Sequence, residues 1–135
     1  MTIREYAAGD EREIRALYGA VGWTNYEKNP AMLRAAYLHS LCALVAWEEN
    51  ALVGAIRAVG DGASIVYIQD VLVRPDFQRR GIGTALVQSV LGRYKAVYQI
   101  GLMTDDLPRT KAFYRSLGFL DAADLGCRMF VKIRP

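Results

Sequence analysis

One stretch of the chain constrains the fold more than any other, because a strand, a turn, a glycine loop and a helix follow one another in it. The run Val71–Val73 is apolar, Arg74-Pro75 is a turn, and Gln78–Gly83 is a basic segment with two glycines. An amphipathic helix is expected directly after it, over residues 81–94. Glycines let a backbone approach an anion closely, and the amides of a helix's first turn point toward it. The order of these parts predicts an anion-binding loop.

The rest of the hydrophobic pattern predicts a mixed α/β fold. Further helices are expected at about 10–20, 29–39 and 106–117. Strands are expected at 2–6, 41–47, 52–59, 64–73 and 97–103, and a closing hairpin at 119–120 and 127–133. Asp10 with Glu13 is expected to cap the first helix, and Asn29-Pro30 to begin the second. The succession of strand, helix and strand over 64–103 predicts a right-handed βαβ crossover. We expect a single domain over residues 1–135.

Composition excludes several classes of function. A net charge of +3 is too small to indicate nucleic-acid binding, and no apolar run is long enough to span a membrane. The N-terminus lacks the apolar core of a signal peptide. His39, Cys42 and Cys127 are the only histidine and cysteines, and their spacing fits no metal site. We therefore expect a cytoplasmic protein without a metal, a membrane or a nucleic-acid partner.

Two familiar phosphate-binding signatures do not fit the loop. A dinucleotide fingerprint needs a third glycine, where this chain has Leu86, and an acidic residue at the end of the next strand. A P-loop needs Gly-Lys-Ser/Thr, which does not follow Gly83.

Two motifs resemble those of the GCN5-related N-acetyltransferases, the GNAT superfamily. Gln78–Gly83 matches the Q/R-x-x-G-x-G/A signature, and Ala112–Phe119 is similar to the family's F-Y-x-x-x-G-F pattern at the end of a helix. The resemblance implies a GNAT-like mixed, mostly antiparallel central sheet flanked by helices. It also implies acetyl-CoA as co-substrate, gripped at the pyrophosphate by loop amides and along the pantetheine arm by the preceding strand. The cofactor-binding residues that it implies are Val71, Leu72, Val73, Gln78, Arg79, Arg80, Gly81, Ile82, Gly83 and Thr84.

The same resemblance implies the catalytic residues. Tyr114 would be the general acid that protonates the departing thiolate. Family members often carry a glutamate on the central strand as base, and here Asp70 is the nearest equivalent. Asp70 is either such a base, an acceptor-binding carboxylate, or a buried carboxylate with an arginine or backbone partner. Strict alternation predicts that Asp70 shares a face with Ile68 and Leu72, opposite Tyr67, Gln69, Val71 and Val73.

The first two helices are expected to cover the acceptor, with Trp23, Tyr26 and Tyr37 as an aromatic wall and Glu27 as a cation partner. At least one of these rings is expected to be ordinary core. Direct attack of a primary amine in a ternary complex is predicted, with a small amine as acceptor and a homodimer as one possible assembly. A non-catalytic acyl-CoA sensor and a protein lysine or N-terminal acetyltransferase are the alternatives.

Overall fold

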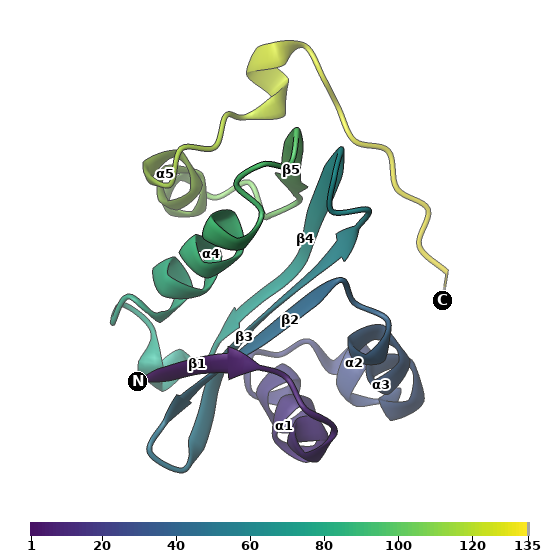
Figure 1. Cartoon of the computed structure of the whole chain (residues 1–135), viewed down its shortest axis with the longest axis vertical. Helices are drawn as coiled ribbons and strands as arrows, with labels where there is room; N and C mark the ends of the chain where they lie inside the picture. The colour runs from purple at the N-terminus through teal and green to yellow at the C-terminus, as the bar shows by residue number, and fades with distance from the viewer. Residues whose placement is uncertain (135) are drawn as a thin grey trace. The chain divides into compact units, whose positions relative to one another are not determined.

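A computed structural model describes residues 1–134 of the chain. The chain divides into two compact units, residues 1–103 and a second unit that begins at Thr104. The first unit contains the whole of the sheet and the glycine loop, and the second contains Tyr114 (Figure 1). The single domain expected from the sequence stays a prediction.

The first unit is a five-stranded sheet in the order β1-β2-β3-β4-β5. The strands are β1 (Thr2–Glu5), β2 (Cys42–Glu48), β3 (Ala51–Gly60), β4 (Ile65–Val73) and β5 (Gln99–Leu102). Its helices are α1 (Glu11–Ala20), α2 (Thr24–Glu27), α3 (Pro30–Leu38) and α4 (Ile82–Arg93). The first four strands pair antiparallel, while β4 and β5 pair in parallel with α4 between them in sequence. The prediction of a mostly antiparallel sheet with a βαβ crossover is confirmed.

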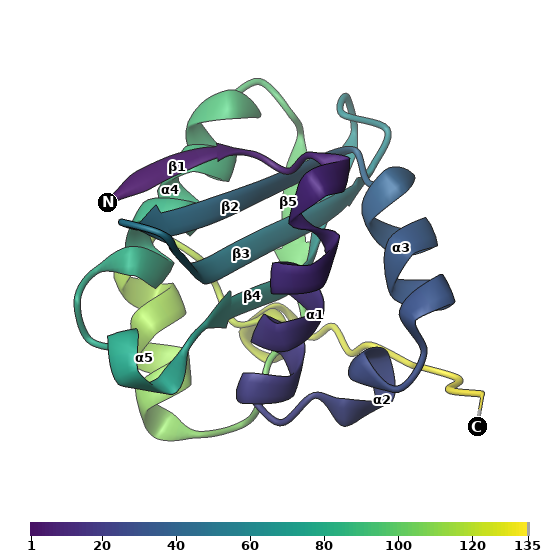
Figure 2. The same ribbon diagram turned by 90° about the horizontal axis from the view of Figure 1, so that it is seen from below.

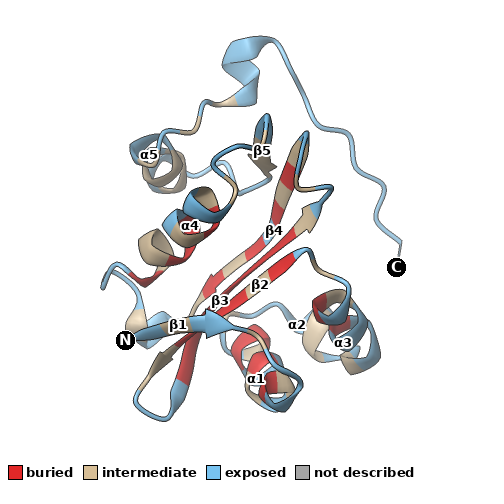
Figure 3. Cartoon of the chain, in the orientation of Figure 1, coloured by how far each residue is buried: buried red, intermediate tan, exposed pale blue. Residues whose placement is uncertain are grey.

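Helices cover the sheet on both faces (Figure 2). On one face, Ile14, Leu17 and Tyr18 of α1 form a buried cluster with Val45, Ala55 and other core residues. On the other face, α4 buries Ile82, Leu86, Val87 and Val90. The buried residues therefore run through the middle strands and along the helix surfaces that face them (Figure 3).

A β-bulge in β4 changes which side chains share a face. Arg57 pairs with Asp70, but the next residue, Ala58, pairs with Ile68, so Gln69 is an extra residue on β4. Because paired residues point to the same face, Asp70 lies on the α1 face with Arg57, and Ile68 lies on the opposite face. The expectation of strict alternation, which placed Ile68 with Asp70 opposite Tyr67, is wrong for this reason.

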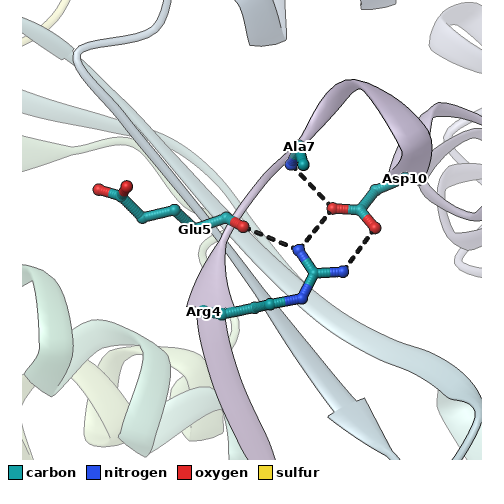
Figure 4. Close-up of polar contacts among 4 residues, drawn as sticks. All are labelled: Arg4, Glu5, Ala7 and Asp10. Atoms are coloured by element: carbon teal, nitrogen blue, oxygen red, sulfur yellow. Dashed lines mark hydrogen bonds and ion pairs between the residues drawn. The ribbon is translucent and has the colours of Figure 1, made fainter.

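The start of α1 also differs from the sequence prediction. Asp10 makes no side-chain cap on α1. Its carboxylate instead accepts two hydrogen bonds from Arg4, at 2.8 and 2.7 Å, and one from the Ala7 amide at 2.8 Å (Figure 4). The Arg4 hydrogen bonds lower the pKa of Asp10, and the Ala7 amide adds to the effect although burial opposes it. Asp10 thus links β1 to the 3₁₀ turn Ala8–Asp10 that leads into α1.

The predicted start of α3 is confirmed, because Asn29 accepts from the Met32 amide and Pro30 follows it.

The second unit contains α5 (Pro108–Ser116) and a 3₁₀ turn (Ala122–Leu125). The predicted helix stop is confirmed, since Gly118 has φ +93° and follows the last turn of α5. The predicted closing hairpin is wrong. Neither 119–120 nor 127–133 is a strand, and the segment between them contains the 3₁₀ turn and Gly126, at φ +72°.

Close packing of α4 on β3 generates a testable prediction. A methyl group on Gly54 would lie 3.1 Å from Cγ2 of Ile82 and 3.1 Å from the carbonyl oxygen of Leu72. We expect Gly54→Ala to lower the free energy of unfolding by about 1–3 kcal/mol through overpacking. Gly92→Ala is the matched control, because no atom lies within 4 Å of the new methyl group and the site is helical. Urea unfolding that ranks Gly92→Ala below Gly54→Ala would contradict this packing.

Candidate active site

The sheet opens between β4 and β5. Their parallel pairing runs from Ile65–Gln99 to Ile68–Leu102 and stops there, whereas β4 continues to Val73. Among the described residues no strand pairs with this last part of β4 on the side away from β3. The edge of β4 from the bulge onward is thus available to another extended chain.

Main-chain groups of alternate residues point into this open edge. The Arg74 amide donates to the Val53 carbonyl at 2.8 Å, so Arg74 and, two residues earlier, Leu72 direct their main chain toward β3. Val71 and Val73 therefore present their N–H and C=O groups to the open side. The Val73 carbonyl accepts from Nε2 of Gln78 at 3.2 Å, which confirms its direction. Leu72 itself is buried in the core.

The loop that follows β4 is compact and has two residues with a left-handed backbone. A 3₁₀ turn over Pro75–Phe77 ends at Gln78. Arg79 has φ +64° and Gly81 has φ +81°, and Gly81 is the N-cap of α4. A non-glycine residue in this region is uncommon and indicates a shape imposed by its surroundings. Apart from its two chain neighbours, no atom lies within 4 Å of the position that a Cβ on Gly81 would take, so the space beside the turn is open there.

The amides at the start of α4 are available to an anion. The first helical hydrogen bond is donated by Ala85 to the Gly81 carbonyl at 3.0 Å. Within residues 1–134, the amides of Arg79, Arg80 and Gly81 and of the first helical residues, Ile82 to Thr84, donate to no carbonyl or side chain. Such amides, with the positive end of the helix dipole, form an anion-binding concavity.

Two arginines of the loop add full positive charge. Arg79 and Arg80 are exposed, and the guanidinium of Arg80 lies over the Phe77 ring at 4.8 Å from its centroid. Arg74 is turned instead toward Asp76, with 3.8 Å between Nε and Oδ1. The loop and the open edge of β4 together fit a ligand with a diphosphate at one end and an extended amide chain at the other.

A buried polar cluster lies on the α1 face at the bulge. Oδ2 of Asp70 accepts from the Tyr18 hydroxyl at 2.7 Å and from Nε of Arg57 at 3.0 Å. The Tyr37 hydroxyl lies 3.0 Å from that of Tyr18. Asp70 is 2% exposed and Arg57 is 6% exposed. The cluster joins α1, α3, β3 and β4 through one carboxylate.

The pKa shifts in the cluster follow from burial and from the shared carboxylate. Burial, then the neighbouring Tyr37 and Asp70, raise the pKa of Tyr18 far above its ordinary value. Burial alone would lower the pKa of Arg57, but Asp70 and Tyr18 more than offset it, so that the pKa is raised. Tyr18 thus stays a hydroxyl donor and Arg57 stays a cation. The contacts of Asp70 are those of the buried, arginine-paired carboxylate considered in the sequence analysis.

The aromatic residues predicted for the acceptor fall into two groups. Trp23 and Tyr26 flank the Tyr18 ring, with centroids 6.0 and 5.2 Å from it, and Trp23 is 37% exposed. Tyr37 is buried and belongs to the core, as was expected for at least one of the rings. The Glu27 carboxylate packs against Gly19 of α1, and its main-chain carbonyl accepts from Nε of Arg15 at 2.8 Å. The structure brings Trp23 and Tyr26 together at an accessible surface.

Tyr114 belongs to the second unit. Its ring packs edge-on against Phe113 and Phe119, at centroid distances of 4.9 and 5.7 Å. Burial raises the pKa of its hydroxyl, and the charge of Asp105 raises it further. Tyr114 is therefore protonated at neutral pH and able to donate. The Asp105 carboxylate accepts from the Leu107 amide at 3.0 Å just before α5.

Sequence reasoning missed three features of the site. Tyr18 was read only as part of a helix, and Arg57 only as part of an apolar strand. Arg57 is the one charged residue in Ala51–Gly60, and a lone charge in such a run needs a buried partner. That signal predicts a carboxylate on a neighbouring strand. The left-handed backbone of Arg79 has no signal of its own in the sequence.

Residues 1–134 contain no group of three or more histidine, cysteine or acidic side chains arranged to hold a metal ion. None of the helices in that range combines the length and the apolar character needed to cross a bilayer.

Comparison with known proteins agrees with this geometry. The model of the acetyltransferase (GNAT) family matches residues 10–119. An acetyltransferase of the GNAT family from Streptococcus pneumoniae TIGR4 has a similar structure, with a TM-score of 0.88 and 40% identity, covering 98% of this chain and 97% of that one.

Two curated plant relatives also match. Serotonin N-acetyltransferase 2, chloroplastic, from Oryza sativa subsp. japonica is 32% identical over 87% of this chain and 60% of its own length. The histone acetyltransferase TAP1 from Glycine max is 34% identical over 82% of this chain and 52% of its length. The chain thus spans a little over half of these curated relatives. With the family model matched from Asp10 to Phe119, and with the loop and sheet described above, this chain belongs to the GNAT family of acetyltransferases.

Proposed function

We propose that the protein transfers an acetyl group from acetyl-CoA to a primary amine, by direct attack within a ternary complex. The observation that carries the proposal is the open edge of Val71 and Val73 leading into a loop whose amides have no partner among residues 1–134. Membership of the acetyltransferase family gives the reaction class. A cytoplasmic location remains a prediction.

The residues present fit acetyl-CoA. The amides from Arg79 to Thr84 would hold the pyrophosphate, and Gly81 leaves its side of the turn open. The outward-facing main-chain groups of Val71 and Val73 would pair with the amides of the pantetheine arm as an added strand does, with the Gln78 side chain giving up its hydrogen bond to the Val73 carbonyl. Acetyl-CoA would supply the acetyl group in activated form, as a thioester. The Val73 amide would donate to the thioester carbonyl oxygen, where negative charge develops.

For the acceptor we propose a small amine, bound beside Trp23 and Tyr26. Aromatic faces attract cations, and these two rings lie next to each other at a partly exposed surface. Protein acetylation is the alternative, and the names of the curated relatives include one acting on serotonin and one acting on histones. An aromatic wall favours the small amine over an extended peptide.

A non-catalytic acyl-CoA sensor is favoured by one specific observation. The only carboxylate on β4, that of Asp70, is buried and accepts hydrogen bonds from Arg57 and Tyr18. No other residue of β4 could act as a base of that kind. Calorimetry with acetyl-CoA, followed by thiol release with a broad panel of amines, separates the two functions. Binding without thiol release for any amine would support the sensor and overturn the proposed enzyme.

The loop geometry leads to a first prediction about ligand binding. We expect Gly81→Val to weaken the binding of coenzyme A at least about tenfold, because a branched side chain would crowd amides that bind a charged group. The change also costs about 1–2 kcal/mol of stability at φ +81°. Gly22→Val is the matched control, with φ +84° and open space around the new side chain but no part in the loop. Calorimetry should show weaker binding in Gly81→Val alone, and equal affinity in both variants would overturn the proposed loop.

Tyr114 is expected to act on turnover and not on cofactor binding. Tyr114→Phe removes the hydroxyl that would protonate the departing thiolate, and we expect kcat to fall by roughly a hundredfold. The affinity for acetyl-CoA should change little, since the proposed cofactor contacts are main-chain groups of the first unit. Thiol release measures the first quantity and calorimetry the second. Unchanged turnover, or parallel loss of both, would contradict the role of general acid.

We expect Asp70 to stabilise the fold through its contacts with Arg57 and Tyr18. Asp70→Ala leaves the Arg57 guanidinium buried without its counter-charge, and we expect a loss of about 3–5 kcal/mol in unfolding free energy. Asp76→Ala, which removes a carboxylate that is 71% exposed, should cost less than about 0.5 kcal/mol. Chemical denaturation measures both. A variant Asp70→Asn that keeps its stability but loses turnover would show instead that Asp70 is the base.

A further inference from the structure

The last residues of β4 are turned over relative to the residues before them. Val66 and Ile68 share one face of the sheet, as residues two positions apart do in a regular strand. Asp70 comes two positions later but lies on the α1 face, because Gln69 is an extra residue without a partner on β3. Leu72 follows Asp70 and is buried in the cluster on the same face. The bulge therefore reverses the orientation of the strand from Asp70 onward.

This reversal decides which main-chain groups are directed away from β3. Along a strand, the face of each side chain and the edge to which its N–H and C=O groups point alternate together. With Asp70 and Leu72 on the α1 face, their main-chain groups point to β3, and those of Val71 and Val73 point away from it. Without the bulge, the end of β4 would shift by one residue and the two sets would change places. Val71 would then hydrogen-bond to β3 instead of facing the open edge.

The buried ion pair favours one of these two arrangements strongly. Oδ2 of Asp70 lies 3.0 Å from both Nε and Nη2 of Arg57, and it also accepts from the Tyr18 hydroxyl at 2.7 Å. In the shifted arrangement Asp70 would leave the α1 face, and Arg57 would stay there buried without its counter-charge, which is very costly. Val71 and Leu72 are both apolar, so burial of these two side chains distinguishes the arrangements much less.

We propose that Arg57 and Asp70 are positioning residues for the cofactor, because their ion pair determines that Val71 and Val73 face the pantetheine arm. Neither charged side chain touches the cofactor, and both act through the orientation of the β4 main chain. This inference rests on the proposed function for the identity of the ligand. The orientation of the main chain itself can be measured without a ligand.

Replacement of both charges separates positioning from stability. A buried ion pair exchanged for apolar side chains of similar volume often leaves a protein as stable as before. In the double variant Arg57→Met with Asp70→Leu, the Tyr18 hydroxyl keeps the Tyr37 hydroxyl as its partner, at 3.0 Å in the native chain. The core is then filled, but no charge selects the face on which residue 70 lies.

Binding of coenzyme A to this double variant is the first test. We expect urea unfolding close to that of the native chain but binding at least about tenfold weaker in calorimetry, because hydrogen bonds of Val71 and Val73 to the ligand are lost. In thiol release, the KM for acetyl-CoA should rise while kcat at saturation changes little. Leu33→Ala, in α3 and the same buried cluster, is the control, since it lowers stability but should leave the affinity unchanged.

Hydrogen exchange of single amides is the second test and needs no ligand. In the native chain the Leu72 amide, directed to β3, should exchange more slowly than that of Val71, and in the double variant this difference should disappear or reverse. If the native chain binds no coenzyme A, the proposed function fails, and amide exchange alone decides the positioning role. A double variant that binds coenzyme A as the native chain does, keeps the native order of exchange, or fails to fold would overturn the proposal.

Discussion

The buried ion pair of Asp70 and Arg57 is the interaction on which the proposed site depends. Both side chains are almost completely removed from water, at 2% and 6% exposure, and a charge so placed needs a partner. Tyr18 donates to the carboxylate, and the Tyr37 hydroxyl hydrogen-bonds to that of Tyr18. Arg57 and Asp70 are paired across β3 and β4 next to the extra residue Gln69, so the ion pair fixes the bulge from the α1 face.

The position of the bulge decides how the edge of β4 is presented. After Gln69 the strand keeps its register with β3 but has lost its partner β5, whose pairing ends at Ile68. The last residues of β4 are thus held on one side only. Val71 and Val73 face outward because Leu72 and Arg74 face β3. The glycine turn then leads into α4, which is anchored by the close contact of Ile82 and Leu86 with Gly54. Anchoring from both sides places the loop amides at the end of the open edge.

The sequence was most informative where local chemistry determines structure. The strand, the glycine loop and α4 were predicted close to their observed bounds, because periodicity and turn residues act over a few positions. The bulge was not predicted, since an extra residue leaves no trace in a run that is apolar on both faces. The prediction that Asp10 caps α1 was wrong because its carboxylate hydrogen-bonds instead to Arg4, six residues away. The C-terminal hairpin was wrong because an alternating pattern forms a strand only where a second strand pairs with it, and the described sheet of β1 to β5 does not include 127–133.

The cofactor side and the acceptor side of the proposed site constrain the sequence differently. The cofactor side is built from main-chain groups, which every residue type carries, and it requires only an open strand edge and one left-handed turn at Gly81. Many sequences meet that requirement, which is consistent with matches to relatives at 32–40% identity. The acceptor side is built from side chains such as Trp23 and Tyr26, on the short α2 and the residue before it. In the proposed site, a few substitutions there would change which amine fits while the sheet and loop stay the same. Family membership thus gives the reaction class, and we propose that the residues around α2 select the acceptor.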